Sequence, residues 1–308
     1  METAKPSIRL GTRASALARW QADWTNARLT ELGTSVEIVL ITTEGDVRTN
    51  PIGEIGGQGL FTKQIQQALL NDEIDIAVHS LKDLPTLPIP GLSLAAVPQR
   101  ESTSDVLVCR EAKSFVSLPN GALVGTGSER RRAQLLHARP ELCVEGIRGN
   151  VDTRLKKLDN GDYDAIILAE AGLKRLGLAD RITEVLPNSM MLPAIGQGAL
   201  GIECRADDEA TKQAVAPLND VESHACVVAE RTLLAALRAG CLAPVGALGH
   251  IDSGSLHLEA VVLNKDGTQR IFATSNGSID DAVAIGQSAA EELLSQGAAE
   301  FIAESRSS

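Results

Sequence analysis

The sequence has few aromatic residues, few cysteines and no excess of positive charge. Aromatic residues make up 2% of the 308 residues, and the formal net charge is −11. A general nucleic-acid surface needs net basic charge and aromatic platforms for base stacking, so this composition argues against that class. The five cysteines are an odd set without a C-x-x-C pair, which indicates neither a disulfide framework nor a zinc ribbon.

Long apolar runs are also missing. No stretch reaches the ~18–20 residues of a membrane span, and the first residues lack the apolar run of ~7–15 that a signal peptide needs. We therefore expect a cytoplasmic protein without nucleic-acid or membrane partners. The chain is 44% hydrophobic, and its 308 residues can form two or three globular domains of roughly 100–150 residues each.

Basic residues are nevertheless concentrated in one segment of this acidic chain. Residues 121–160 carry eight basic and five acidic side chains, a local balance of +3. Such a cluster can hold an anionic ligand. The basic members are Arg130, Arg131, Arg132, Arg139, Arg148, Arg154, Lys156 and Lys157.

Two parts of the chain share one local pattern of strand, Gly-Thr turn and helix. The first, "IRLGTRASALARWQADW", starts at Ile8, and its helix has Ser15 as a candidate cap and Leu17, Trp20 and Trp24 on one face. The second is "ALVGTGSERRRAQLL" at residues 122–136. Helix N-terminal amides and an arginine meet at both turns, which favours an anion there. Neither copy completes G-x-G-x-x-G or a Walker P-loop, so nucleotide binding is disfavoured.

Strands and helices alternate up to about residue 180, which predicts α/β domains with a mostly parallel sheet. Residues 60–73 read as a helix with Phe61, Ile65, Ala68 and Leu69 on one face. From Val221 the pattern changes to a helix, two strands around an Asp266-Gly267 turn and a last helix, which indicates a third, α+β domain.

Cys241 follows the first helix of this third domain, in the loop "AGCLAPVG". A cysteine in such a loop is either a reactive group or a small packed residue, and the local context leaves both open. At a helix C-terminus the macrodipole disfavours a thiolate, so Cys241 is poorly placed as a nucleophile that acts in every turnover.

Five blocks of the sequence together resemble the porphobilinogen deaminase family, also called hydroxymethylbilane synthases. They are "HSLKDLP" (79–85), "GTGSERRRAQL" (125–135), "IRGNVDTRLKKLDNGDYDAIILAEAGLKRLG" (147–177), "LPAIGQGALGIECR" (192–205) and "AGCLAPVG" (239–246). The resemblance runs in order from about Ile8 to the final helix. It implies a transferase of heme and tetrapyrrole biosynthesis that joins four porphobilinogen molecules head to tail with loss of ammonia and releases hydroxymethylbilane by adding water.

The resemblance also implies a cofactor and a set of site residues. A dipyrromethane group, made from the substrate, would be fixed by a thioether to Cys241. Asp83 would be the catalytic carboxylate. Cofactor and substrate carboxylates would be bound by Arg13, Ser15, Lys82, Ser128, Arg130, Arg131, Arg148, Arg154 and Arg175. No metal is implied.

A carboxylate at position 83 suits this chemistry. Loss of ammonia leaves an electron-poor azafulvenium ring, and a fixed anion that accepts hydrogen bonds from pyrrole N–H groups would stabilise it. Asp83 follows the strand "IDIAVHS", at the edge where open α/β sheets place ligands. Without the resemblance, Lys82 and Asp83 could equally be a solvated loop pair. His79 alternates with apolar residues on the strand and is expected to be a buried core residue.

Some basic positions do not correspond to family contacts. Arg132, Arg139, Lys156 and Lys157 are therefore expected on solvated helix faces. The glycine-rich loop also departs from the family, because Gln58 stands where many relatives have lysine and Glu54 where some are basic. This puts a role for loop charge in doubt, although Lys63 could partly substitute.

We expect three domains, two of them related, periplasmic-binding-protein-like α/β domains with the active site in the cleft between them. The first covers residues 1–98 and 199–216, the second covers 99–198, and a C-terminal α+β domain with a small antiparallel sheet covers 217–308 and carries Cys241. A monomer is expected, since no coiled-coil pattern is present. The competing hypothesis is a non-catalytic, two-lobed protein that binds carboxylate solutes.

Overall fold

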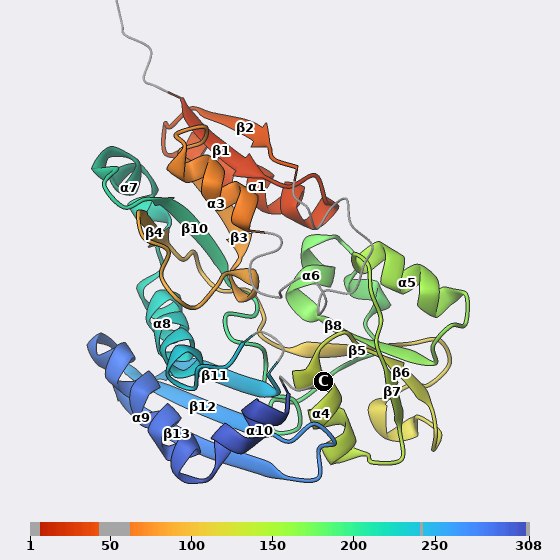
Figure 1. The fold of residues 1–308 in the computed structure, drawn as a ribbon. Coiled ribbons are helices and arrows are strands. Elements are labelled where there is room, and N and C mark those ends of the chain that lie inside the picture. Colours follow the sequence, from red (N-terminus) through yellow and green to blue (C-terminus); the bar gives the residue numbers. More distant parts are fainter. Residues whose placement is uncertain (1–6, 43–61, 241–242, 306–308) are drawn as a thin grey trace, which may run out of the picture. The chain divides into compact units, whose positions relative to one another are not determined.

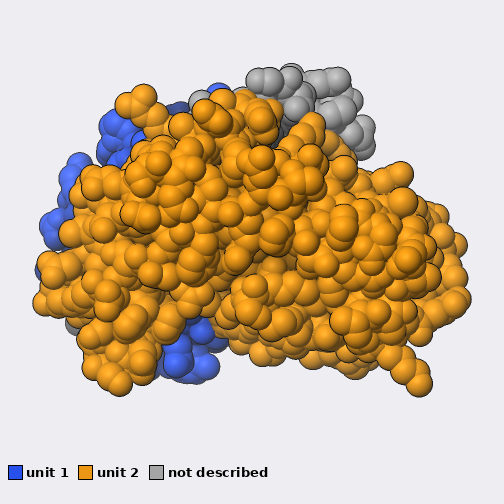
Figure 2. All heavy atoms as spheres, turned by 90° about the horizontal axis from the view of Figure 1, so that it is seen from below, with its two compact units in different colours: residues 1–100, 199–224 blue, residues 101–198, 225–308 orange. Residues whose placement is uncertain are grey.

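The computed structural model describes residues 7–42, 62–240 and 243–305. The chain divides into two compact units, which Figure 2 colours separately: residues 1–100 with 199–224, and residues 101–198 with 225–308. The predicted division into three domains, with the boundaries given above, stays a prediction.

The first unit contains a five-stranded sheet (Figure 1). Its strand order is β2-β1-β3-β10-β4. The strands are β1 (Ile8–Thr12), β2 (Val36–Leu40), β3 (Ile76–Ser80), β4 (Leu92–Ala96) and β10 (Leu200–Arg205). β1 runs parallel to β2 and β3, whereas β10 runs antiparallel to β3 and β4.

The second unit contains a sheet of the same design, with the order β7-β6-β8-β5-β9. The strands are β5 (Asp105–Cys109), β6 (Leu123–Gly125), β7 (Cys143–Glu145), β8 (Ala165–Ala169) and β9 (Glu184–Val185). β6 runs parallel to β7 and β8, and β5 runs antiparallel to β8 and β9. The matching order and directions confirm the prediction of two related α/β halves.

In each sheet four of the five strands run in the same direction, as the prediction of a mostly parallel sheet requires, and one strand runs against them. In each sheet one strand enters out of chain order, β10 in the first and β5 in the second, and it pairs antiparallel with both neighbours. Alternation of strands and helices along the chain predicts only the parallel part, because it carries no signal for a strand that arrives from a distant segment.

The helices around these two sheets begin close to the predicted positions, except for the helix at residues 209–215, which was not predicted. The first unit has α1 (Ala16–Glu31), α3 (Lys63–Leu70) and α7 (Glu209–Val215), and the second has α4 (Glu129–Ala138), α5 (Val151–Asp159) and α6 (Glu170–Arg175). The buried face of α3 carries Ile65, Ala68 and Leu69, as predicted, while Phe61 lies outside the described residues.

The predicted face of α1 is wrong. The buried residues of this helix are Gln21, Ala22, Thr25 and Leu29, whereas Leu17, Trp20 and Trp24 are only partly buried. Two of the four buried side chains, Gln21 and Thr25, are polar. A prediction from the spacing of apolar residues therefore chose the face next to the one that is buried.

The C-terminal part of the second unit is a three-stranded antiparallel sheet, β11-β12-β13, with helices (Figure 1). Its strands are β11 (Val245–Asp252), β12 (Ser255–Leu263) and β13 (Arg270–Ser278), and its helices are α8 (Val221–Ala236), α9 (Ala282–Ser295) and α10 (Ala298–Glu304). The hairpin of β12 and β13 was predicted, and β11 was not. The predicted last helix is divided into α9 and α10 at Gly297, which has φ 97°.

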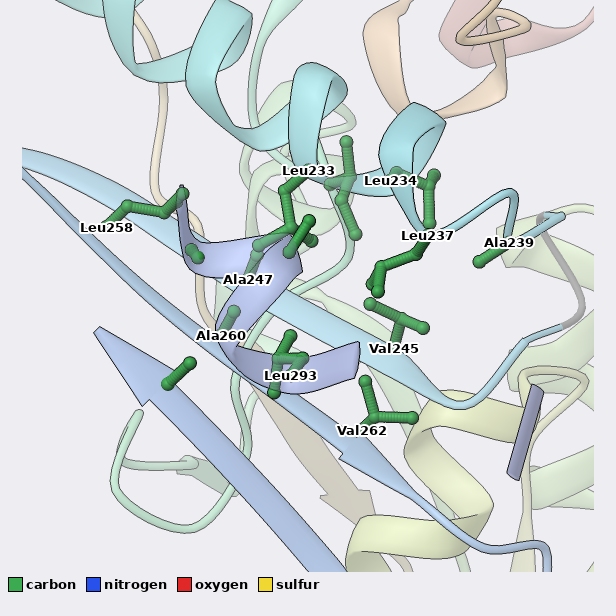
Figure 3. Close-up of a cluster of buried hydrophobic side chains, with 14 of the residues drawn as sticks. Leu233, Leu234, Leu237, Ala239, Val245, Ala247, Leu258, Ala260, Val262 and Leu293 are labelled. Carbon is green, nitrogen blue, oxygen red and sulfur yellow. The ribbon is translucent and has the colours of Figure 1, made fainter. Parts of the chain in front are cut away.

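Buried side chains join α8, α9 and this sheet into one apolar core (Figure 3). Leu233, Leu234 and Leu237 meet Val245 of β11 and Leu293 of α9 in this cluster. The burial of such aliphatic side chains stabilises the end of α8 and the start of β11, the two elements that flank positions 241 and 242.

The β12–β13 turn packs against α4 within the same unit. Gly267 has φ 74°, and a Cβ atom there would lie 2.4 Å from the carbonyl oxygen of Ala133. Nδ1 of His137 lies 2.8 Å from the carbonyl oxygen of Gly267. The turn therefore holds α4 in place, and α4 carries Arg130 and Arg131. None of the helices in the described ranges is long and apolar enough to cross a membrane.

Candidate functional site

Four predicted site residues lie at one edge of the first sheet. Because β1 and β3 are parallel neighbours, the segments that follow them leave the same edge. Arg13 and Ser15 follow β1, and Lys82 and Asp83 form a short 3₁₀ turn, η2 (Leu81–Asp83), directly after β3. Oγ of Ser15 accepts a hydrogen bond from the Ala18 amide at 3.4 Å, which confirms Ser15 as the cap of α1.

The turn that carries Asp83 is held by its apolar neighbours. Leu81 and Leu84 are buried, with 1% and 6% of their surface exposed, whereas Asp83 between them is exposed. The Leu81 amide donates to the carbonyl of Ala199 at 3.0 Å. The carboxylate of Asp83 is therefore offered to solvent or ligand by a fixed backbone.

Side-chain hydrogen bonds also fix the strand that leads into this turn. Nε2 of Gln21 on α1 donates to Oγ of Ser80 at 2.7 Å. His79 is buried, as predicted, and its Nε2 lies 3.0 Å from Oε2 of Glu203. Nε2 of Gln66 donates to the same oxygen at 3.1 Å. These polar side chains tie α1, α3 and β10 to the end of β3.

In the second unit, the first turn of α4 brings two arginines into the protein interior. Ser128 is the N-cap, and its Oγ accepts from the Arg131 amide at 3.5 Å. Arg130 and Arg131 are 3% and 6% exposed. The concentration of basic residues in this segment indicated a cationic site, and the structure buries two of its members side by side.

A single carboxylate, Asp105 at the start of β5, faces both guanidinium groups. Nη2 of Arg130 lies 2.7 Å from Oδ2 of Asp105. Nε and Nη2 of Arg131 donate to Oδ1 at 3.0 and 2.7 Å. Nε2 of Gln197 donates to the same Oδ1 at 2.9 Å. Two positive groups thus share one negative group.

The ionisation of these groups follows from burial and mutual attraction. Burial alone would raise the pKa of Asp105, but Arg130 and Arg131 lower it to about 2. Burial lowers the pKa of Arg130, against the attraction of Asp105. Two guanidinium groups against one carboxylate leave an excess positive charge in a buried place, which is costly unless an anion joins it.

The next turn of this sheet lies against the N-terminus of α4. A Cβ atom on Gly127 would lie 2.9 Å from the carbonyl oxygen of Ile147, so the two backbones are in close contact. Arg148 follows Ile147 and is exposed. Arg154 stands in α5, and its Nε donates to the carbonyl of Gly149 at 2.8 Å. Both arginines therefore lie on segments that follow β7, next to the turn before α4.

Arg175 at the end of α6 is mostly buried, and burial lowers its pKa. Its Nη2 donates to the carbonyl of Gly198 at 2.7 Å. Cys241, Gln58 and Glu54 lie outside the described residues. Lys63 is the first residue of α3.

Two residues of the buried cluster, Asp105 and Gln197, were not predicted from the sequence, although a lone aspartate that begins an apolar strand is a signal for a buried pair. The prediction of a solvated helix face is wrong for two arginines. Arg139 is not on a solvated face: its Nη1 donates to the carbonyls of Phe115 and Leu118 at 3.0 and 2.9 Å. Arg132 likewise donates to the carbonyl of Val144. Both arginines therefore donate to backbone carbonyls of neighbouring segments.

These features define an α/β protein with two sheets of one design and a buried cationic site on the second. Residues 8–213 match the profile described as porphobilinogen deaminase, dipyromethane cofactor binding domain, and residues 224–295 match porphobilinogen deaminase, C-terminal domain. The chain belongs to the porphobilinogen deaminase family. As a member of this family it is a transferase, and it carries the domain that binds the dipyrromethane cofactor.

Curated relatives support this membership over nearly the whole chain. The porphobilinogen deaminase of Syntrophotalea carbinolica is 47% identical over 300 residues, which cover 96% of this chain and 95% of the relative. That of Acidithiobacillus ferrooxidans is 48% identical over 303 residues, with 97% and 98% covered.

Solved structures of other families are much less similar. The methionine binding protein MetQ covers 69% of this chain and is itself covered to 89%, with 13% identity and a TM-score of 0.46. Likeness at this level implies nothing about ligands. The alternative of a non-catalytic solute-binding protein is not favoured, because the family match spans both parts of the chain.

The donor set of the second unit suits the cofactor of this family. A dipyrromethane built from porphobilinogen carries several carboxylates. The cluster around Asp105 has one positive charge in excess, and the buried Nε of Arg130 has no hydrogen-bond partner in the described part of the chain. A carboxylate is the group that would satisfy both needs.

Proposed function

We propose that this chain joins four porphobilinogen molecules head to tail, with release of ammonia at each step, and frees linear hydroxymethylbilane by hydrolysis. The observation that carries the proposal is the pair of buried guanidinium groups that share Asp105. Their excess positive charge suits a ligand rich in carboxylates, and each pyrrole of this chemistry carries an acetate and a propionate. Within an acidic protein, such a site would hold a polyanion that the rest of the surface repels.

Asp83 is the proposed catalytic residue. When the amino group of the substrate's aminomethyl side chain leaves as ammonia, the electrons of the broken C–N bond leave with nitrogen, and the methylene carbon that stays behind shares a positive charge with the pyrrole ring. The carboxylate of Asp83 would accept hydrogen bonds from the pyrrole N–H and stabilise this charge. Its support is its position after β3, exposed on a turn whose two leucines are buried.

Cys241 is the proposed attachment point of the dipyrromethane. When bound, that group supplies the pyrrole carbon on which the product chain is built. The chain's own contribution there would be one thioether bond, formed once by the Cys241 sulfur.

The remaining predicted residues are proposed to hold carboxylates. In the first unit these are Arg13, Ser15 and Lys82, and in the second Ser128, Arg130, Arg131, Arg148, Arg154 and Arg175. Each charge-assisted hydrogen bond contributes about 1.5–3 kcal/mol when partly desolvated. We further propose a cytoplasmic monomer. Four cysteines in the described ranges are free thiols, as a reducing compartment would keep them.

Intact-protein mass spectrometry tests the proposal. Protein from heme-competent cells should exceed its sequence mass by two linked pyrrole units. Limiting porphobilinogen should then add a ladder of further pyrrole units, and excess substrate should yield hydroxymethylbilane. A protein whose mass equals its sequence mass, and which gains no pyrrole units from porphobilinogen, would contradict the proposal and favour the non-catalytic binding protein.

A further inference from the structure

We propose that the segment Leu192–Gly198 positions the arginines of the cofactor site, and that Gln197 and Glu230 are the side chains through which it does so. The segment belongs to the block "LPAIGQGALGIECR", to which the proposed function assigns no role. The residues that make the contacts described below all belong to the second unit. It rests on the proposed function, because the site it positions is the proposed cofactor site.

The first end of the segment holds Arg130. The carbonyl of Leu192 accepts a hydrogen bond from Nη1 of Arg130 and another from Nε2 of Gln134, the latter at 3.0 Å. The Leu192 amide donates to Oε1 of Gln134 at 2.8 Å. Leu192 is 1% exposed, so these bonds form away from water and fix the backbone relative to α4.

The other end holds Arg131 and Arg175. Gln197 is fully buried, and its Nε2 donates to Oδ1 of Asp105 at 2.9 Å and to the carbonyl of Thr103 at 2.7 Å. The Asp105 oxygen that receives this bond is the one that Arg131 binds. The carbonyl of Gly198 accepts from Arg175. One amide side chain thus orients the carboxylate on which Arg131 is aligned.

Glu230 fixes the middle of the segment to the C-terminal sheet. This residue of α8 is fully buried. Its Oε2 accepts from the Gly196 amide at 2.7 Å and its Oε1 from the Gly249 amide of β11 at 2.8 Å. A carboxylate that bridges two backbone amides forms charge-assisted bonds, which are stronger than neutral ones.

Three further contacts hold this segment close to its neighbours. The Ala247 amide of β11 donates to the carbonyl of Pro193 at 3.0 Å. A Cβ atom on Gly246 would lie 2.8 Å from the carbonyl oxygen of Leu192. At Gly198, which has φ 84°, a Cβ atom would lie 2.3 Å from the carbonyl oxygen of Glu101. Side chains at these glycines would force the backbones apart.

The segment therefore links the arginines of α4 and α6 to α8 and β11, the elements on either side of position 241. Three predicted carboxylate-binding arginines are attached to it directly or through Asp105. If the link is loosened, the protein should stay folded, because each half keeps its own core, but the arginines should meet the incoming carboxylates less often in the right geometry.

The test uses apoprotein and porphobilinogen, with intact mass as the readout. Gln197→Met keeps the side-chain volume and removes both donated hydrogen bonds. At a temperature where far-UV circular dichroism shows the variant folded, the rate of covalent gain of the cofactor mass should fall roughly 10–100-fold, the loss expected for a hydrogen bond to a charged group. The matched control is Gln296→Met on the surface of the same unit, where two exposed hydrogen bonds are lost and the rate should not change.

Glu230→Gln is the second variant and alters the bridge between the Gly196 and Gly249 amides. An amide can accept from only one of the two backbone N–H groups and turns its own N–H₂ toward the other. We expect slower mass gain than in the wild type, while the control Glu292→Gln on α9 should match the wild type. If Gln197→Met does not fold, Gln197→Asn, which withdraws the amide by one methylene, should fold and show an intermediate loss.

The outcomes separate this inference from the proposed function. A wild-type apoprotein that gains no covalent mass contradicts the proposed function itself. A wild type that gains the cofactor while folded Gln197 and Glu230 variants gain it at the same rate overturns the positioning role alone. Slow gain that merely tracks the unfolded fraction of each variant would also overturn it, because the residues would then serve stability only.

Discussion

Arg131 directs two of its nitrogens, Nε and Nη2, to one oxygen of Asp105, at 3.0 and 2.7 Å. The other oxygen of Asp105 faces Arg130 at 2.7 Å. This carboxylate is therefore the only described acidic group with an ion pair to either arginine. Its charge matters to both stability and ligand binding, which can be measured separately.

Asp105→Asn should destabilise the protein strongly. The substitution leaves two buried guanidinium groups without a counter-charge, and breaking a buried pair in this way costs about 3–5 kcal/mol. Urea unfolding followed by circular dichroism measures the loss. The matched control is Asp159→Asn, which removes a surface pair with Arg181 in the same unit and should cost less than about 1 kcal/mol. Equal effects of the two substitutions would show that the buried pair is not stabilised as described.

Asp83→Asn should leave a folded enzyme with its cofactor attached and slow the reaction by about 10²–10³-fold, or ~2.7–4 kcal/mol. The reason is the loss of negative charge beside the cationic ring, at constant shape. Product formation from porphobilinogen measures the rate, and intact mass checks the cofactor. Asp207→Asn, exposed in the same unit, is the control. Activity within a factor of a few of wild type would assign the charge stabilisation to another group.

Cys241→Ser should give folded protein without the covalent cofactor and with almost no activity, because a hydroxyl is a much weaker nucleophile than a thiol toward the alkylating species. The measurement is intact mass. Cys143→Ser serves as control, since Cys143 is an exposed free thiol. Normal cofactor mass in the Cys241 variant would falsify the attachment site.

The arginines should divide between early and late steps. Loss of Arg130, Arg131 or Arg154 should already impair assembly of the cofactor. Truncation of Arg148 or Arg175 should leave the cofactor in place and stall elongation, with each lost pair weakening the affected intermediates by roughly 10–100-fold. The mass ladder at limiting porphobilinogen distinguishes the two groups. An Arg148→Leu protein with the wild-type ladder and turnover, or with no cofactor at all, would contradict this division.

Acid should destabilise the first unit through Asp75. Burial alone would raise the pKa of Asp75, but hydrogen bonds from Arg9 and Arg205 lower it from 3.8 to about 2. The unfolded chain therefore binds this proton more readily than the folded chain, and stability falls as the pH drops from about 4 to about 2. Asp75→Asn should make the free energy of unfolding less dependent on pH in this window, as urea titrations at several pH values would measure. An unchanged slope would mean that other carboxylates account for the acid sensitivity.

The repeated strand, turn and helix could be predicted from the sequence because its signals are local. Ser15 caps the helix that follows its turn, as residue type and spacing indicated, and the structure shows Ser128 in the same role after the second turn. The positions of β5 and β10 could not be predicted in this way. Their partners lie far along the chain: β10 pairs Ile202 with Val78 and with Ala96.

The candidate site shows the same limit. The arginines were visible as a basic segment, but their carboxylate partner is 26 residues from Arg131, and Gln197 is 92 residues from Asp105. A buried polar cluster forms where the ends of particular strands meet in the folded protein. Contacts between such distant residues leave no repeating pattern in the sequence. For the same reason the buried face of α1, with Gln21 and Thr25, could not be distinguished from its neighbour by hydrophobic spacing.

The place of β10 between β3 and β4 has a consequence for how the protein is made. During synthesis the ribosome releases residues 1–100 well before residues 200–205, so the first sheet lacks an interior strand while the next ninety-odd residues emerge. Until then β3 and β4 each present an unpaired backbone edge, to which another nascent chain could add. All strands of the second sheet lie between residues 105 and 185, so this sheet can form first. Newly made protein should thus pass through a stage in which the later-encoded half is ordered and the N-terminal half depends on chaperones.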